Sequence, residues 1–71
     1  MTTVQLEYII ALDTYRSFVL AAEKTFVTQP TLSMQVQKLE DELGVKLFDR
    51  SKLPIVPTQI GAVVIEQARV A

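Results

Sequence analysis

The sequence predicts a small, all-α domain with a small β-hairpin, and three observations support this fold class. Apolar residues recur at helical spacing in four stretches, and each stretch follows a Ser or Thr that can cap a helix. Between the third and fourth stretches the pattern changes to that of two short strands joined by a turn. The chain has 71 residues, of which 49% are hydrophobic, which suits one domain with one modest core.

The composition excludes several classes of function. The sequence has no Cys and no His, so disulfides, the commonest metal sites and the commonest acid–base catalyst are excluded. The apolar runs are too short to span a membrane, and the N-terminus lacks the basic start and apolar block of a signal peptide. We therefore expect a soluble, cytoplasmic protein that is not an enzyme and uses no cofactor and no metal.

The first two helices are predicted from their caps. Thr2 and Gln5 match a capping box, which predicts a first helix over about residues 3–15. Ser17 can cap a second, short helix, in which two alanines share a face with Phe18 and let another helix approach closely. Only three or four residues separate this helix from the next one.

Thr28 and Pro30 predict the start of the third helix. Thr is a good N-cap, and Pro in the first turn sacrifices no backbone N–H that the helix would use. Gly44 supplies its stop. The predicted buried stripe comprises Leu32, Val36, Leu39 and Leu43. At about 100° per residue, the opposite face comprises Pro30, Thr31, Met34, Gln37, Lys38 and Asp41, with Ser33 and Gln35 on its flanks.

The charge around this helix is uneven, although the net charge of the chain is only −1. Residues 25–38 contain no carboxylate, and Glu40, Asp41 and Glu42 all follow Lys38. We expect these three acids to form a solvated helix end. Local charge matters more than net charge at a binding face, so the first half of the helix remains open to an anion.

A hairpin and a fourth helix complete the predicted fold. Residues 45–50, "VKLFDR", have strand character, residues 51–54, "SKLP", predict a turn, and residues 55–57, "IVP", predict a second strand whose proline suits an edge. Thr58 can cap the fourth helix. One face of that helix comprises Ile60, Val63, Val64 and Ala68, and the nearly opposite face Ala62 and Ile65.

A helix that is apolar on two sides in so small a domain requires a second partner. The sequence ends at Ala71 without a cap, so we expect it to be part of a longer protein.

Two helices joined by a tight turn and followed by a hairpin form the winged helix-turn-helix arrangement, whose second helix enters the DNA major groove. Side chains there must donate to and accept from base edges, as Gln29 and Gln35 can, and Thr31 can contact a thymine methyl. Thr28 and Ser33, with the free amides of the first turn, can hold phosphate.

Basic residues extend this surface, with Lys38 on the helix and Arg50 and Lys52 on the hairpin. Each feature also has a simpler interpretation, because any helix needs a cap and basic residues on turns aid solubility. Two alternatives therefore stay open. One is a helical protein-interaction or dimerisation module without specific DNA binding; the other, a small enzyme, has no acid–base pair to support it.

The helices and hairpin contain the segments "LEYIIALDTYRSFVLAAEKTFVTQPTLSMQVQKLEDELGVKLFDR" and "PTQIG". These segments resemble the N-terminal DNA-binding domain of LysR-type transcriptional regulators, over residues 4–71. Within that family, "TQPTLS", "QKLEDELGV" and "QARV" are similar to the OxyR-like, hydrogen-peroxide-sensing regulators.

The resemblance implies a homodimer that binds an inverted repeat in double-stranded DNA, with residues 28–43 in the major groove and the wing on the backbone. It also implies that Met34 stands where many members carry Arg. Taken together, the chemistry of this surface and the resemblance predict the DNA-binding residues Thr28, Gln29, Pro30, Thr31, Ser33, Met34, Gln35, Lys38, Arg50 and Lys52.

The resemblance divides the chain into a winged helix-turn-helix over residues 1–58 and the start of a linker helix over residues 59–71. Ala62, Ile65 and Arg69 would meet the second subunit, and the full-length protein can form a tetramer. An effector domain outside this chain would carry the signal-sensing residues of an activator of peroxide-stress genes.

Overall fold

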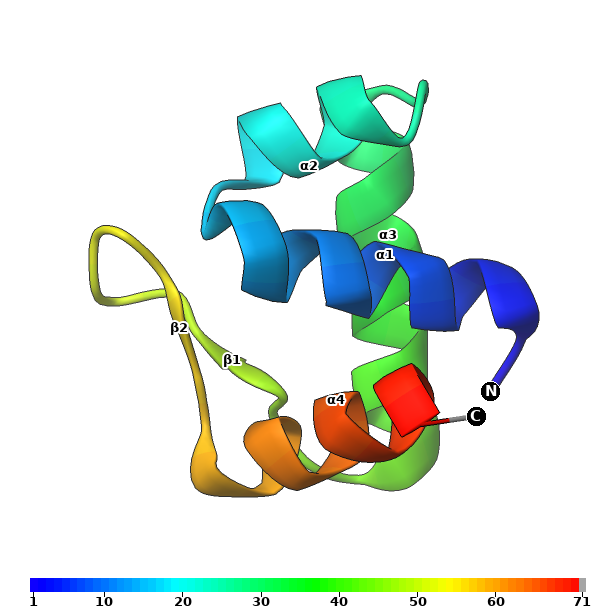
Figure 1. Cartoon of the computed structure of the whole chain (residues 1–71), viewed down its shortest axis with the longest axis vertical. Helices are drawn as coiled ribbons and strands as arrows, with labels where there is room; N and C mark the ends of the chain where they lie inside the picture. The colour runs from blue at the N-terminus through cyan, green and yellow to red at the C-terminus, as the bar shows by residue number, and fades with distance from the viewer. Residues whose placement is uncertain (71) are drawn as a thin grey trace.

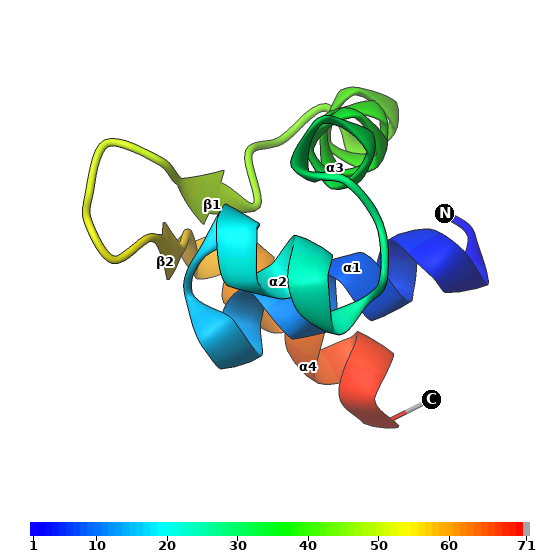
Figure 2. The same cartoon turned by 90° about the horizontal axis from the view of Figure 1, so that it is seen from above.

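The computed structural model describes residues 1–70 and contains four helices and one hairpin (Figure 1). In chain order they are α1 (Thr3–Tyr15), α2 (Phe18–Lys24), α3 (Gln29–Leu43), β1 (Phe48–Asp49), β2 (Val56–Pro57) and α4 (Gln59–Val70). Helix α1 contacts each of the other three helices, with α2 and α4 on opposite sides of it and α3 crossing behind (Figures 1 and 2). None of the helices in residues 1–70 has the length and apolarity needed to cross a membrane.

The predicted helix caps are confirmed. The Thr2 hydroxyl accepts the Gln5 N–H at 3.1 Å, and the Gln5 side chain accepts the Thr2 N–H at 3.0 Å, which completes the capping box. Ser17 and Thr28 each accept a backbone N–H from three residues further on, at the starts of α2 and α3. Helix α3 ends at Gly44, whose φ of 71° favours glycine.

The turn between α2 and α3 is tight, as predicted. The Val27 N–H donates to the Ala22 carbonyl oxygen at 3.0 Å, and the Phe26 N–H to the Glu23 carbonyl oxygen at 3.2 Å. Phe26 has a left-handed φ of 61°, and its side chain is 95% exposed. An aromatic residue is thus strained at this position without gaining burial.

Replacing Phe26 with Asn is expected to raise the free energy of unfolding by about 0.5–1 kcal/mol, because Asn tolerates the left-handed conformation and no buried contact is lost. Urea denaturation followed by circular dichroism measures the change. Val19→Asn, an exposed site with ordinary helical backbone, is the control and should give no gain. A Phe26→Asn protein no more stable than the wild type would contradict the expected strain.

The core lies where the four helices and the hairpin meet. Its largest fully buried side chains are Ile9, Leu12, Leu32, Leu39, Leu47 and Val36. The predicted stripe of α3 is therefore confirmed for three residues but is wrong for Leu43, which is 38% exposed. Residues 41–44 are all exposed, so the last turn of α3 extends beyond the packed core.

The hairpin is present, but its strands are shorter than predicted. Phe48 pairs with Pro57 and Asp49 with Val56 in an antiparallel register. Leu47 lies outside this ladder and is buried beside Phe48, so the two residues do not alternate between faces. Both polar groups of Leu47 bond elsewhere, its N–H to a side chain of α3 and its carbonyl oxygen to the start of α4.

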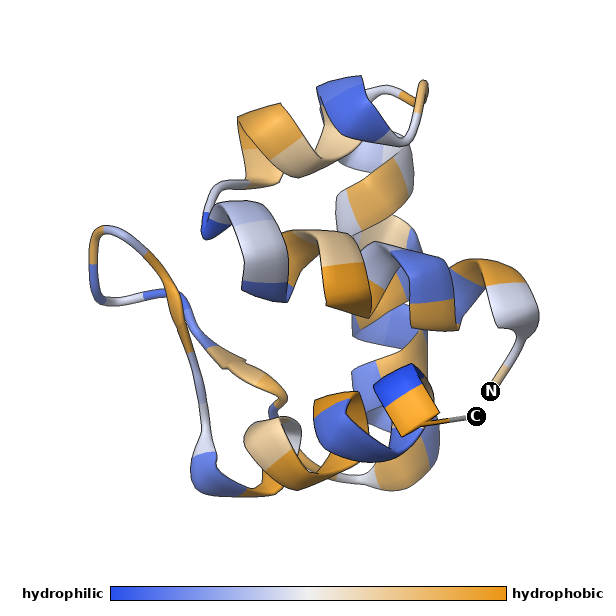
Figure 3. Cartoon of the chain, viewed as in Figure 1, coloured by the Kyte–Doolittle hydropathy of each residue, from blue (hydrophilic) through white to orange (hydrophobic). Residues whose placement is uncertain are grey.

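Helix α4 begins as predicted, because the Thr58 hydroxyl accepts the Gly61 N–H at 3.0 Å. The sequence pattern predicted two apolar faces for this helix without deciding which one packs inward. Ile65 is only 3% exposed and belongs to the core, whereas Ile60 and Val63 are exposed. The reason is Gly61, whose missing side chain lets the backbone of α4 lie directly against Leu47. Hydrophobic residues remain on more than one side of α4 (Figure 3).

Candidate nucleic-acid interface

The first half of α3 presents an exposed face free of carboxylates. The exposed members of the predicted DNA-binding set on this helix and its cap are Thr28, Gln29, Pro30, Thr31, Met34 and Lys38. Ser33 and Gln35 are half-buried on the flanks. The structure thus brings eight of the ten predicted residues together on one element, while Arg50 and Lys52 lie on the hairpin.

The first turn of α3 offers few free amides. The Thr28 hydroxyl accepts the Thr31 N–H at 3.3 Å and donates to the Thr31 hydroxyl at 2.8 Å. Pro30 has no N–H. Within residues 1–70, the Gln29 N–H is therefore the donor of this turn that remains for an anion.

Gln35 has a partner inside the domain. Its Oε1 accepts the Gln5 Nε2 at 3.3 Å, which links α3 to the capping box of α1. Its amide N–H groups remain available as donors, so contact of Gln35 with DNA stays a prediction.

Glu40 contradicts the prediction that the acids of α3 form a solvated end. Its side chain is only 1% exposed, and it accepts the Leu47 N–H at 2.7 Å and Arg50 at 3.3 Å. The Leu47 N–H lies outside the hairpin ladder and needs an acceptor, which explains the buried carboxylate. Asp41 and Glu42 are exposed as predicted, and Glu42 pairs with the N-terminal amine of Met1 at 2.7 Å.

Arg50, predicted to contact DNA, is held by groups of its own chain. Its guanidinium pairs with Glu40 and lies 4.7 Å from the centre of the Phe18 ring in α2. Lys52 is exposed in the turn of the hairpin. Of the two predicted basic residues of the wing, Lys52 is thus the more accessible to phosphate.

The turn of the hairpin is stabilised by Asp49. Ser51 donates both its hydroxyl and its backbone N–H to the Asp49 carboxylate. These two bonds, with a smaller effect of the Lys52 charge, lower the pKa of Asp49 below its ordinary value. Asp49 is therefore ionised at neutral pH and partly offsets the positive charge of the wing.

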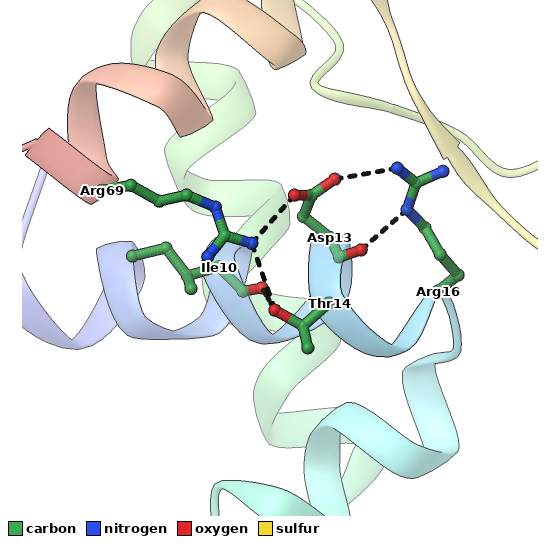
Figure 4. Close-up of polar contacts among 5 residues, drawn as sticks. All are labelled: Ile10, Asp13, Thr14, Arg16 and Arg69. Carbon is green, nitrogen blue, oxygen red and sulfur yellow. Dashed lines mark hydrogen bonds and ion pairs between the residues drawn. The ribbon is translucent and has the colours of Figure 1, made fainter.

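The three predicted dimerisation residues have different environments. Ile65 is buried in its own chain, so its predicted exposure to a second subunit is wrong. Arg69 donates to Asp13 at 2.9 Å and to Thr14 at 3.1 Å in α1 (Figure 4). Ala62 is exposed.

Asp13 is a residue that the sequence reasoning missed. It also accepts Arg16 at 3.1 Å, so it joins the end of α1 to α4 (Figure 4). No local signal could reveal this, since Asp13 and Arg69 are 56 positions apart in the chain.

An apolar hollow between α1 and α4 was also missed. It is lined by Met1, Leu6, Val63, Val64, Gln67 and Ala68. The paired valines of α4 were its signal, but periodicity alone does not show which element they face.

A short α2, a tight turn, an exposed polar face on α3 and a following hairpin together define a winged helix-turn-helix domain. Comparison with known families identifies the branch of this class. The model of the bacterial regulatory helix-turn-helix proteins of the lysR family matches residues 3–62. The chain belongs to the LysR family.

Relatives of known function are similar over most of the chain. The hydrogen peroxide-inducible genes activator of Pectobacterium carotovorum is 52% identical over 64 residues, and the DNA-binding transcriptional dual regulator OxyR of Escherichia coli K12 is 50% identical over 64 residues. Each alignment covers 90% of this chain and 21% of the relative. The chain thus spans about a fifth of the length of the curated relatives it matches.

Solved structures share the fold. The BenM DNA-binding domain in complex with benA site 1 DNA superposes with a TM-score of 0.94 at 38% identity, covering 97% of this chain and 78% of that one; the BenM relative is from Acinetobacter baylyi. Full-length OxyR from Pseudomonas aeruginosa superposes with a TM-score of 0.92 at 48% identity, covering 97% of this chain and 23% of that one.

Proposed function

We propose that this chain binds double-stranded DNA sequence-specifically as the N-terminal domain of a LysR-type transcriptional regulator. The observation that carries the proposal is the exposed, carboxylate-free face on the first half of α3. A merely solvated helix has no need to exclude acids from that face, whereas a helix in the major groove does. The BenM DNA-binding domain, which shares the fold, was solved in complex with DNA, and this supports DNA binding by the present chain.

The side chains on α3 and the hairpin then have distinct roles. Gln29 and Thr31 approach base edges, because an amide can donate and accept and a Thr methyl can contact thymine. Lys38 and the half-buried Ser33 contact the backbone. Lys52, in the turn of the hairpin, contacts the DNA backbone.

Met34 is 51% exposed on the same face and adds an apolar, flexible contact to the bases. The resemblance places it where many family members carry Arg. In this chain the position therefore contributes no charge to the interface.

We further propose that the chain acts as a homodimer on an inverted repeat. The exposed apolar residues of α4, Ile60, Val63 and Val70, are the surface for the second copy, with Ala62 beside them. An exposed apolar face of this kind on a helix favours association. Residues 1–58 then form the DNA-binding unit and α4 the start of the linker helix.

The relatives also support a cellular role. Because those at 50–52% identity are named for hydrogen peroxide-inducible genes and OxyR, we propose that the full-length protein is a cytoplasmic activator of peroxide-stress genes.

The experiment that tests DNA binding is titration of operator and scrambled duplexes with Lys38→Ala and Gln29→Ala proteins at several salt concentrations. If two subunits together neutralise about six phosphates, the slope of log K against log salt is about −5. Lys38→Ala should weaken binding to both duplexes and reduce the slope by roughly 1 per subunit. Gln29→Ala should instead lower discrimination between them by about 1–3 kcal/mol.

Gln59→Ala, at an exposed site on α4, is the matched glutamine control and should bind like the wild type. The face assignment is wrong if both α3 variants also bind like the wild type. The protein-interaction alternative makes a different prediction, since such a module would not be retained on nonspecific duplex at low salt. The stoichiometry at saturation tests the dimer, for which we expect two chains per inverted repeat.

A further inference from the structure

We infer that Glu40 is a positioning residue that fixes the wing relative to the recognition helix, so that both meet the same DNA duplex. This inference rests on the proposed function for its meaning, but the contacts that carry it lie within the free protein. Glu40 would not itself contact DNA, because its side chain is only 1% exposed.

The carboxylate of Glu40 uses both of its oxygens toward the segment that leads into and out of β1. Oε2 accepts the Leu47 N–H at 2.7 Å, and Oε1 accepts the Arg50 Nη2 at 3.3 Å. A buried carboxylate is costly unless it is paired and hydrogen-bonded. Glu40 therefore holds two points of the chain, one on each side of β1, against α3.

Each of those points is fixed a second time. The Leu47 carbonyl oxygen accepts the Thr58 N–H at 2.9 Å, so the backbone of Leu47 is bonded to α3 through its N–H and to the start of α4 through its carbonyl. The Arg50 guanidinium lies 4.7 Å from the centre of the Phe18 ring, so it also contacts α2. The carboxylate of Glu40 lies at the centre of contacts that join both helices of the helix-turn-helix to the wing.

The hairpin cannot set its own direction. Its strands have only two residues each, and so short a ladder is marginal by itself. Its turn, residues 50–55, makes no other hydrogen bond to the helices than that of Arg50, within the residues that the structure describes. Phe48 and Ile55 anchor the hairpin in the core, and Glu40 supplies the polar contacts that fix the direction of the turn that carries Lys52.

The test is a double-mutant cycle between Glu40→Gln and Lys52→Ala, measured as operator affinity at several salt concentrations. Gln has the shape of Glu but presents an NH₂ group to one of two donors, so one contact is lost. In the wild-type background Lys52→Ala should reduce the salt slope by about 1 per subunit. In the Glu40→Gln background the effect of Lys52→Ala should be smaller, because the turn of the hairpin is held less firmly over the DNA backbone.

The matched control is Glu42→Gln, on the exposed side of the same helix, which should leave the effect of Lys52→Ala unchanged. Arg50→Lys is the second variant, since it keeps the charge but loses the planar contact with Phe18. If the Glu40→Gln protein does not fold, Arg50→Lys takes its place in the double-mutant cycle and should likewise reduce the effect of Lys52→Ala on operator affinity. Equal effects of Lys52→Ala in all backgrounds would overturn the inference.

Hydrogen exchange of the free protein separates this inference from DNA binding. Glu40→Gln should speed exchange of the Leu47 amide and of the hairpin amides about tenfold, while the amides of α1 keep their rates. Exchange that rises equally in α1 and the hairpin, or in neither, would refute positioning by Glu40. Failure of the wild type to bind DNA would refute only the proposed function, because the exchange result stands without DNA.

Discussion

Replacing Gly61 with Ala is expected to unfold a large fraction of the protein. A Cβ on Gly61 would lie 1.9 Å from the Leu47 carbonyl oxygen and 2.8 Å from its carbonyl carbon. These are backbone atoms, so no side-chain rotation can relieve the clash, and α4 would have to move away from the hairpin. We expect a loss of about 3 kcal/mol or more, a large part of the stability of so small a domain.

Thermal and urea denaturation followed by circular dichroism measure this loss. The matched control is Gly44→Ala, where an added Cβ meets no atom within 4 Å but φ is +71°. Gly44→Ala should therefore lower the free energy of unfolding by only about 1 kcal/mol, through backbone strain alone. A Gly61→Ala protein as stable as the Gly44→Ala protein would show that α4 does not lie against Leu47.

The second large effect is expected for Leu32→Ala. Leu32 lies on the inner side of α3 and is fully buried in the core. Its truncation therefore removes buried apolar surface and leaves a cavity. The expected loss in the free energy of unfolding is about 2–5 kcal/mol. Much of the protein would then be unfolded at 37 °C, and DNA binding would be lost for both operator and scrambled duplexes.

Leu43→Ala provides the control in the same helix and the same sequence pattern. Because Leu43 is already 38% exposed, its truncation should lower stability by only about 1 kcal/mol. The comparison uses urea midpoints at constant m-value. Similar losses for the two leucines would mean that the last turn of α3 is packed after all, as the sequence pattern predicted.

The helices were predictable because their signals are local. Thr2, Ser17, Thr28 and Gly44 each act within a few residues, and the structure confirms all four as helix ends. The winged helix-turn-helix followed from the order and spacing of these signals. The exposed face of α3 was equally predictable, because the apolar residues that recur at helical spacing from Leu32 onward show which side faces inward.

The errors concern contacts between distant parts of the chain. Periodicity predicted two apolar faces on α4 but could not show that Ile65 packs inward, because the close approach of two backbones that Gly61 permits is not a local signal. Glu40 was assigned to solvent by its charge, since nothing local shows that the Leu47 N–H needs an acceptor. The partners of Arg50 and Arg69 were hidden for the same reason. Glu40 comes close to Arg50, and Asp13 to Arg69, only when the chain folds.

The start of the chain has a practical consequence for recombinant work. The Met1 amine pairs with Glu42, and the Met1 side chain lines the hollow beside Val63 and Val64. An affinity tag fused there would convert the amine to an uncharged amide and place foreign residues over the surface proposed for the second copy. A purification handle at the opposite terminus, or one removed by a protease that leaves Met1 as the first residue, avoids masking self-association.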